Sequence, residues 1–445
     1  MSTEKKKHSA WEQALHLAAQ TPESRNRYVD FLRAFSIIIV ICGHWLVVAF
    51  YVKDGEIFLP DILSISPWTQ WLTWILQVMP IFFIVGGFSN SISWQSALKR
   101  GEGYKVWFAT RLRRLISPVL PVLVIWAVIG IIANLFNADT AILKPASAFA
   151  LLPAWFLVVY IVVVSLVPLV YRAWERFKIG SFWMLVAAAI LVDAAVFLLG
   201  WKSLGWVNYI FVWVAVHQLG VAWQAQSMGD SRKRLLWAFG GIAALIALVT
   251  FGPYPISMVS VHGEEISNTL PPNLTMLALG VFQSGLLLSL EKPIRKWLST
   301  LKIWAATVLI NGMIMTLFLW HVTVLVLVAG LLLALGGIGL GVAPGSGAWW
   351  LTRQIWILLL SVILLTLVPI FLRYERLPSQ KSPSSTPTWR LLLGALFFCT
   401  GLAILTLKGV TTNNLLGVRV IELALPFIGA VIAKLGVLSS VKMNR

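Results

Sequence analysis

The chain has 445 residues, of which 59% are hydrophobic and 12% are charged, and its formal net charge is +18. Apolar stretches of about 18 residues or more recur along it, which predicts a polytopic membrane protein and excludes a soluble domain of any size. In a soluble chain such a charge would indicate nucleic acid, but here the basic residues fall in alternate loops, as the positive-inside rule predicts. We therefore expect a lipid bilayer, and no nucleic acid, as a partner.

The apolar stretches predict an all-α, polytopic transmembrane helix bundle. A short interfacial helix is expected first, from Ala10 to Ala19. Twelve spans are expected after it, near residues 29–51, 69–97, 112–136, 149–171, 181–200, 206–224, 235–251, 273–290, 304–334, 350–372, 390–408 and 415–437. The first 27 residues and every second loop carry most of the arginines and lysines, which predicts a multi-pass protein of the cell membrane with both termini cytoplasmic.

Four parts follow from this pattern. Residues 1–27 are expected to form a cytoplasmic N-terminal segment, and residues 28–373 a transmembrane core of ten spans. The serine- and proline-rich composition of residues 374–389 predicts a cytoplasmic linker. Residues 390–445 then form an additional C-terminal transmembrane hairpin and tail, which is a candidate appendage to the ten-helix core.

The first span carries two ionisable side chains, Arg33 near its start and His44 near its end. They are eleven positions apart. At about 100° per residue, that spacing puts both on one helix face, about 16 Å apart along the axis. Singly, His44 fits a hydrogen bond between helices equally well, and Arg33 a side chain that reaches the headgroups. Together they favour a site, because ionisable residues at membrane depth usually face a bundle interior or a wet cavity.

Other segments hold residues able to carry chemistry. The second span contains Gly86 and Gly87, which either pack tightly against another helix or let a ligand approach. Arg111, Arg113 and Arg114 form a basic cluster that either fixes topology and contacts anionic lipid or binds the phosphates of a nucleotide cofactor.

Three more ionisable residues lie at membrane depth, namely His321, His217 and Asp193. For His217 and Asp193 we favour hydrogen bonds between helices. The histidines show no metal-binding spacing, so no metal is expected. Both cysteines, Cys42 and Cys399, lie in apolar segments, and the sequence indicates neither a disulfide framework nor redox chemistry.

These motifs together resemble those of acyltransferase family 3. The run from Arg27 to Ala34, continuing to His44, is similar to the first-helix signature of that family. Its other motifs are similar to Phe82-Phe83-x-x-Gly86-Gly87-Phe88, the Arg111–Arg114 cluster, Trp155-Phe156-Leu157 and Leu319-Trp320-His321. The resemblance covers residues 27–373, with Gly86 at a position where the family motif has serine.

The resemblance implies an integral-membrane O-acyltransferase that moves an acyl group, most simply acetyl, from acyl-CoA to a hydroxyl. The acceptor would be an envelope glycan, a glycolipid or a secondary metabolite. His44 is then the expected general base, because an imidazole accepts a proton near neutral pH. Arg33 is expected to act in catalysis and, with Arg111, Arg113 and Arg114, to hold the donor phosphates. The candidate supporting residues are Asp30, His321, Phe83, Gly86, Gly87 and Trp155.

Two other classes of function fit parts of the sequence. A transporter or flippase commonly has twelve spans with both ends inside. Neither an internal repeat nor paired carboxylates for ion coupling are readable here, and this counts against a transporter. A catalytically inactive scaffold is the third class. The sequence leaves the oligomeric state and the acceptor open.

Overall fold

The computed structural model describes residues 9–375 and 386–436. Within these ranges the chain is an all-α bundle, and its two short strands, β1 (Tyr51–Lys53) and β2 (Glu56–Phe58), form one antiparallel hairpin in which Val52 faces Ile57. Eleven helical stretches of the described chain are long and apolar enough to cross a membrane. The predicted polytopic transmembrane helix bundle is therefore confirmed.

The helices of the first half of the chain are α1 (Ala10–Ala19), α2 (Arg27–Val47), α3 (Ile62–Ile65), α4 (Thr69–Leu76), α5 (Met79–Lys99), α6 (Tyr104–Ile116), α7 (Val119–Leu135), α8 (Thr140–Ala150), α9 (Ala154–Phe177) and α10 (Gly180–Leu198). Those of the second half are the 3₁₀ helix η1 (Lys202–Val207), α11 (Asn208–Gln224), α12 (Ser231–Phe251), α13 (Leu274–Trp297), α14 (Leu301–Asn311), α15 (Ile314–Ala334), α16 (Gly347–Glu375), α17 (Thr388–Lys408) and α18 (Val420–Ile432). The helix expected from Ala10 to Ala19 has the predicted bounds.

Several predicted spans are made of two helices. The second span breaks between α4 and α5, where Pro80 lies in the first turn of α5 because proline starts a helix more readily than it continues one. Gln77 fills the break, since its side chain accepts from the N–H of Met79 and its carbonyl accepts from Gln283. Pro118 separates α6 from α7 in the same way, and Gly312 follows the end of α14.

The last predicted span, 415–437, is shorter in the structure. Only the 13 residues of α18 are helical there, and at about 1.5 Å per residue they fall well short of the roughly 30 Å hydrocarbon core. The residues before α18 turn back on themselves, with Thr411 bridged to Val418. Most of the linker predicted at 374–389 lies outside the described residues.

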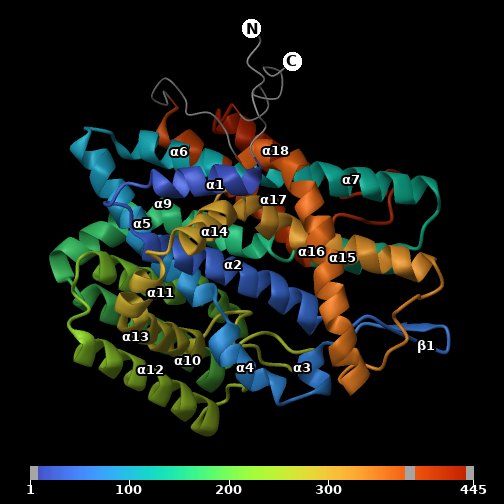
Figure 1. Cartoon of the computed structure of the whole chain (residues 1–445), viewed down its shortest axis with the longest axis horizontal. Coiled ribbons are helices and arrows are strands. Elements are labelled where there is room, and N and C mark those ends of the chain that lie inside the picture. Colours follow the sequence, from blue (N-terminus) through green and yellow to red (C-terminus); the bar gives the residue numbers. More distant parts are fainter. Residues whose placement is uncertain (1–8, 376–385, 437–445) are drawn as a thin grey trace.

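Helix α2 runs through the middle of the bundle (Figure 1) and packs against α5, α13, α14, α15 and α16. Its first turn is fastened where α13 ends, because Arg295 donates to Asn26 and Arg27 donates to the carbonyl of Leu298. The end of the bundle where α2 begins carries the basic loops, and we call it the basic end. The other, where α2 meets the β1–β2 hairpin, is the far end.

The C-terminal hairpin is part of the bundle. Helix α17 packs against α6, α8 and α9 as well as α18 (Figure 1), and its inward face, which includes Leu391, Phe398 and Leu402, is fully buried. The turn between the two helices is tied to the core at two points. The N–H of Val410 donates to Ser147 Oγ at 2.9 Å, and Asn134 donates to the carbonyl of Leu415 at 3.1 Å. The contacts therefore do not separate this hairpin from the ten-helix core.

Candidate active site

Two histidines from different helices meet inside the bundle. His44 lies in the last turn of α2 and His321 in the first half of α15, and His44 Nδ1 is 2.8 Å from His321 Nε2. Their rings stack with centroids 5.1 Å apart and an interplanar angle of 19°. His321 is fully buried, whereas His44 is only partly buried. The structure thus brings together two of the residues that the sequence had singled out separately.

The hydrogen bonds of His321 determine which nitrogens of the pair carry hydrogen. His321 Nδ1 is 2.7 Å from the carbonyl oxygen of Phe318, which can only accept, so this nitrogen donates. In neutral His321 the other nitrogen, Nε2, is then an acceptor, and His44 must donate to it from Nδ1. His44 Nε2 is left with a free lone pair, and no described residue forms a hydrogen bond with it. That nitrogen can accept a proton from a substrate.

Aromatic side chains hold the histidine pair in place. The indole of Trp45 donates to the carbonyl of His321 at 2.9 Å, which locks α2 to α15 beside the pair. Phe318, one turn before His321, packs edge-on against Phe156 of α9. Apolar walls around a base exclude water and strengthen the few polar contacts that remain.

Two of the predicted supporting residues belong to the next layer of this aromatic cluster. Phe83 is fully buried and stacks on Trp213 of α11, with centroids 4.5 Å apart. Trp155 contacts Trp213 and Phe156. Neither ring contacts the histidines directly in the described structure, so both support the walls of the site.

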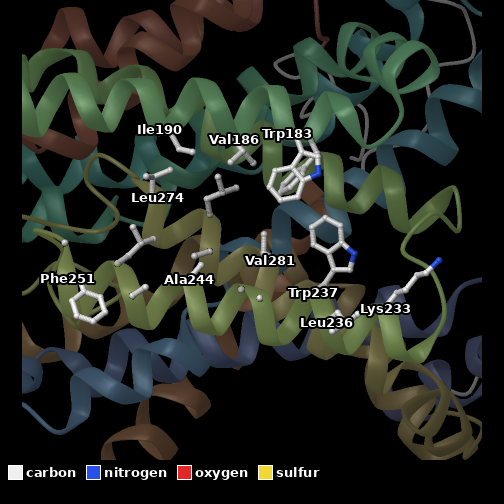
Figure 2. Close-up of a pocket in the computed structure, with 18 residues that line it drawn as sticks. Trp183, Val186, Ile190, Lys233, Leu236, Trp237, Ala244, Phe251, Leu274 and Val281 are labelled. Atoms are coloured by element: carbon white, nitrogen blue, oxygen red, sulfur yellow. The ribbon is translucent and has the colours of Figure 1, made fainter.

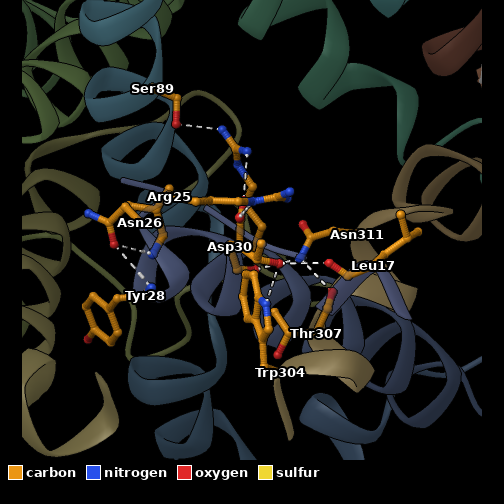
Figure 3. Close-up of polar contacts among 12 residues, drawn as sticks. Leu17, Arg25, Asn26, Tyr28, Asp30, Ser89, Trp304, Thr307 and Asn311 are labelled. Carbon is orange, nitrogen blue, oxygen red and sulfur yellow. Dashed lines mark hydrogen bonds and ion pairs between the residues drawn. The ribbon is translucent and has the colours of Figure 1, made fainter. Parts of the chain in front are cut away.

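Arg33 lies nearer the basic end and is held from two sides. Its Nη2 donates to Ser89 Oγ of α5 at 2.6 Å, and its Nη1 lies 3.6 Å from the Asp30 carboxylate. Asp30, one of the candidate supporting residues, therefore contacts Arg33, but it lies closer to Arg25, whose Nε is 2.7 Å away. Figure 3 shows this network, in which Asn311 of α14 also donates to the Asp30 carbonyl. The Arg33 side chain keeps 34% of its surface exposed.

The three arginines of the basic cluster are not equivalent. Arg111 is partly buried on α6, close enough to Arg33 and Arg114 for their charges to interact, and its guanidinium lies over the ring of Trp107. It forms no ion pair with a carboxylate of the described chain. Arg113 is partly buried and Arg114 is exposed. Arg33 and Arg111 therefore make a cationic centre, whereas Arg114 faces outward.

The paired glycines serve helix packing. A Cβ at Gly87 would overlap the carbonyl of His217, and one at Gly220 would overlap the carbonyl of Ile84, so α5 and α11 cross in backbone contact. Gly86 instead makes room for Tyr160, whose hydroxyl lies 3.2 Å from where a Cβ at Gly86 would be. The Tyr160 hydroxyl thus fills space next to the position of the serine expected from the family motif.

Sequence reasoning missed several polar residues between the two centres. Asn90 of α5 donates to the Tyr160 hydroxyl at 3.4 Å and is 3.3 Å from His217 Nε2. Tyr160 is in turn close enough to Arg111 to interact with it. The expected bonding of His217 between helices is present. Ser89 and Asn90 directly follow the second-helix motif, and this was the only sequence signal for them.

Asp193 also has the structural role that we favoured. Its carboxylate accepts from Asn208 at 2.7 Å, from the Tyr254 hydroxyl at 2.8 Å and from the N–H of Leu274 at 2.9 Å. These bonds tie α10 to the start of α13. Among the described residues, His, Cys, Asp and Glu side chains form no group of three that could hold a metal ion.

A large apolar groove lies elsewhere on the molecule. It has a volume of about 880 Å³ and is lined by α10, α12 and α13, with Trp183 and Trp237 stacked across it (Figure 2). Lys233 is the one ionisable residue in its lining. It contains none of the histidines or arginines described above, so it does not form the candidate site.

An apolar helix bundle that holds a hydrogen-bonded imidazole pair and a separate guanidinium centre has the features of a membrane-embedded enzyme. Comparison with protein families matched residues 26–374 to a family model described as an acyltransferase domain. The match covers most of the chain, which therefore belongs to acyltransferase family 3 and is a membrane acyltransferase. No curated protein and no solved structure matched the chain.

Proposed function

We propose that the protein transfers an acyl group, most simply acetyl, from cytosolic acyl-CoA to a hydroxyl of an envelope glycan, a glycolipid or a secondary metabolite. The observation that carries this proposal is the hydrogen-bonded His44–His321 pair, which leaves a lone pair on His44 Nε2. An alcohol is a poor nucleophile near neutral pH, so a base must remove its proton during attack. The family match supports acyl transfer as the chemistry.

In the proposed reaction the acceptor oxygen attacks the thioester carbonyl while His44 Nε2 takes the hydroxyl proton. His321 Nε2 accepts from His44 Nδ1–H throughout, which orients the ring and stabilises the charge that develops on it. The tetrahedral intermediate then collapses, the carbon–sulfur bond breaks, and the proton passes from His44 to the leaving thiolate. The products are the ester and free CoA, and the base returns to its starting form.

Arg33 and Arg111 are proposed to bind the donor phosphates at the basic end. Two observations support this role. Arg111 lacks a carboxylate partner in the described chain, and Arg33 remains partly exposed although it is held by Ser89 and Asp30. Guanidinium groups bind phosphate through paired N–H donors, so they are suited to it. The extended arm of CoA would then reach along α2 from Arg33 toward His44, about 16 Å farther.

This assignment places the basic end in the cytoplasm, where acyl-CoA is made, and the acceptor at the far end. The positive-inside distribution of arginines and lysines supports that orientation and a cell-membrane location. Both termini are then cytoplasmic, because α18, although short, returns along α17 until Gly429 lies against Gly394 near the start of α17.

The proposal is tested by acyl-CoA binding and turnover with the purified protein in lipid nanodiscs. We expect saturable binding of acetyl-CoA and its slow hydrolysis without acceptor. Arg33→Lys should weaken binding about tenfold, because an ammonium does not reproduce the guanidinium fork. The matched control is Arg100→Lys, an exposed residue of the same end that pairs with Glu102 and should bind normally. Absence of acetyl-CoA binding by the wild type would contradict acyl-CoA as the donor.

A further inference from the structure

Arg353 is a buried cation that pairs with no carboxylate of the described chain. Its residue is 3% exposed, and its guanidinium carbon lies 4.3 Å from the ring centroid of Trp349 and 5.3 Å from that of Trp356. Among the described residues, no acceptor forms a hydrogen bond with its Nε or Nη1, and no carboxylate pairs with it. The structure places this arginine inside α16, among the buried residues of that helix.

Arg353 and His44 both lie toward the far end of the bundle. Helix α16 contacts α2, and Trp349 in the first turn of α16 packs in one cluster with Ala49 just beyond the end of α2. Arg353 lies one turn after Trp349, about 6 Å along α16, and His44 lies three residues, about 4.5 Å, before the end of α2 at Val47. Both side chains are therefore on the far side of the proposed donor phosphates, which would be bound at Arg33.

The two tryptophans stabilise the charge of the guanidinium but do not accept hydrogen bonds from it. Cation–π contacts attract the charge to the ring faces, but the donors at Nε and Nη1 have no acceptor among the described residues. Buried donors without partners are destabilising. The fork of N–H groups matches the oxygens of a carboxylate or a phosphate. An oxyanion in the plane of the guanidinium would satisfy those donors.

We infer that Arg353 binds an oxyanion carried by the acceptor, which makes the acceptor an acidic sugar or a sugar phosphate. This inference rests on the proposed acyl transfer and specifies its acceptor. The donor is not the source of this anion, because its phosphates are assigned to Arg33 and Arg111 at the other end of the bundle. Arg353 would position the acceptor so that one of its hydroxyls meets His44.

The test measures thermal unfolding of the full-length protein in phosphatidylcholine nanodiscs at matched ionic strength. Saturating CoA is present, so that phosphate probes cannot bind at the donor arginines. Glucuronate, glucose 1-phosphate and glucose are titrated in turn. The variants are Arg353→Gln and Arg353→Lys, and the matched control is Lys202→Gln, an exposed cation at the same end.

We expect at least one of the two anions, and not glucose, to raise the unfolding midpoint of the wild type and of Lys202→Gln. The more effective anion identifies a carboxylate or a phosphate as the recognised group. The anion concentration that gives half of the full rise in midpoint should be at least tenfold higher in Arg353→Gln than in the wild type. The increase should be smaller in Arg353→Lys, which retains a charge. If Arg353→Gln does not fold, the Arg353→Lys shift decides.

The inference is overturned if neither anion stabilises the wild type, or if either stabilises the arginine variants as strongly as the wild type. The CoA response gives a separate readout. If CoA does not raise the unfolding midpoint of the wild type, this counts against the proposed acyl transfer. If CoA still stabilises Arg353→Gln while the anions no longer do, this supports a site devoted to the acceptor.

Discussion

The chemistry of the site rests on the tautomers of two histidines. The carbonyl of Phe318 fixes the hydrogen of His321 on Nδ1, and His321 in turn fixes the hydrogen of His44 on Nδ1. Neither step requires a carboxylate. The arrangement therefore differs from a carboxylate–histidine pair, because the orienting group is neutral at rest and can itself accept the proton that His44 gains.

This relation predicts different outcomes for two substitutions of His321. In His321→Gln the side-chain carbonyl can still accept from His44 Nδ1–H, so transfer should fall only modestly. His321→Leu has no acceptor, and the rate should fall about 10²-fold, within the range that positioned proton transfer contributes. Initial rates of label transfer from acetyl-CoA are the measurement. Equal rates in the two variants would show that the hydrogen bond does not orient His44.

At the scale of elements, the site depends on how closely its helices approach. The crossing of α5 and α11 at Gly87 and Gly220 is in backbone contact, which small residues permit in membranes. Through this crossing, α5 presents Ser89 to Arg33 and Asn90 to His217. A wider crossing would move both contacts.

We therefore expect Gly87→Ala to destabilise the protein, because the new Cβ would overlap the His217 carbonyl. Overpacking typically costs about 1–3 kcal/mol, and the unfolding midpoint in nanodiscs should drop accordingly. The control is Gly240→Ala on α12, where a Cβ would meet open space and helix propensity improves. A midpoint for Gly87→Ala at or above that of Gly240→Ala would rule out the close crossing.

At the scale of the whole molecule, the C-terminal hairpin lies outside the matched residues 26–374, yet it packs into the bundle. Removing residues 386–445 would expose the faces of α6, α8 and α9 that α17 covers. We expect the truncated chain to aggregate in detergent and to lose activity. Leu396→Ala, on the lipid-facing side of α17, should behave as the wild type. A monodisperse, active truncated protein would make the hairpin dispensable.

Sequence periodicity predicted those features that one helix contains. The membrane spans followed from apolar length, and the common face of Arg33 and His44 followed from their spacing. Sequence periodicity did not predict contacts between segments that are distant in the sequence. His321 lies 277 positions from His44, and nothing local indicates that they meet. Similarly, the pairing of Gly87 with α11 and the burial of Arg353 depend on which helices become neighbours.

The departures in the predicted spans also have local causes. Hydropathy is averaged over a window of many residues, so it did not reveal the helix breaks at Pro80 and Pro118. It also counted α18 and the residues before it as one span, although the chain turns back before α18 begins. Helix breaks also position the site. Helix α5 begins at the break beside Pro80, and α15, which carries His321, begins at the break just after Gly312.

The most direct test of the account is transfer of labelled acetyl from acetyl-CoA to a pooled envelope-glycan extract by the wild type and by His44→Ala. His262→Ala, in an exposed loop, is the matched control. The account predicts transfer by the wild type and the control, and a loss of about 10²- to 10⁴-fold in His44→Ala at equal protein level in the membrane. Wild-type transfer by His44→Ala would contradict the assignment of His44 as the general base.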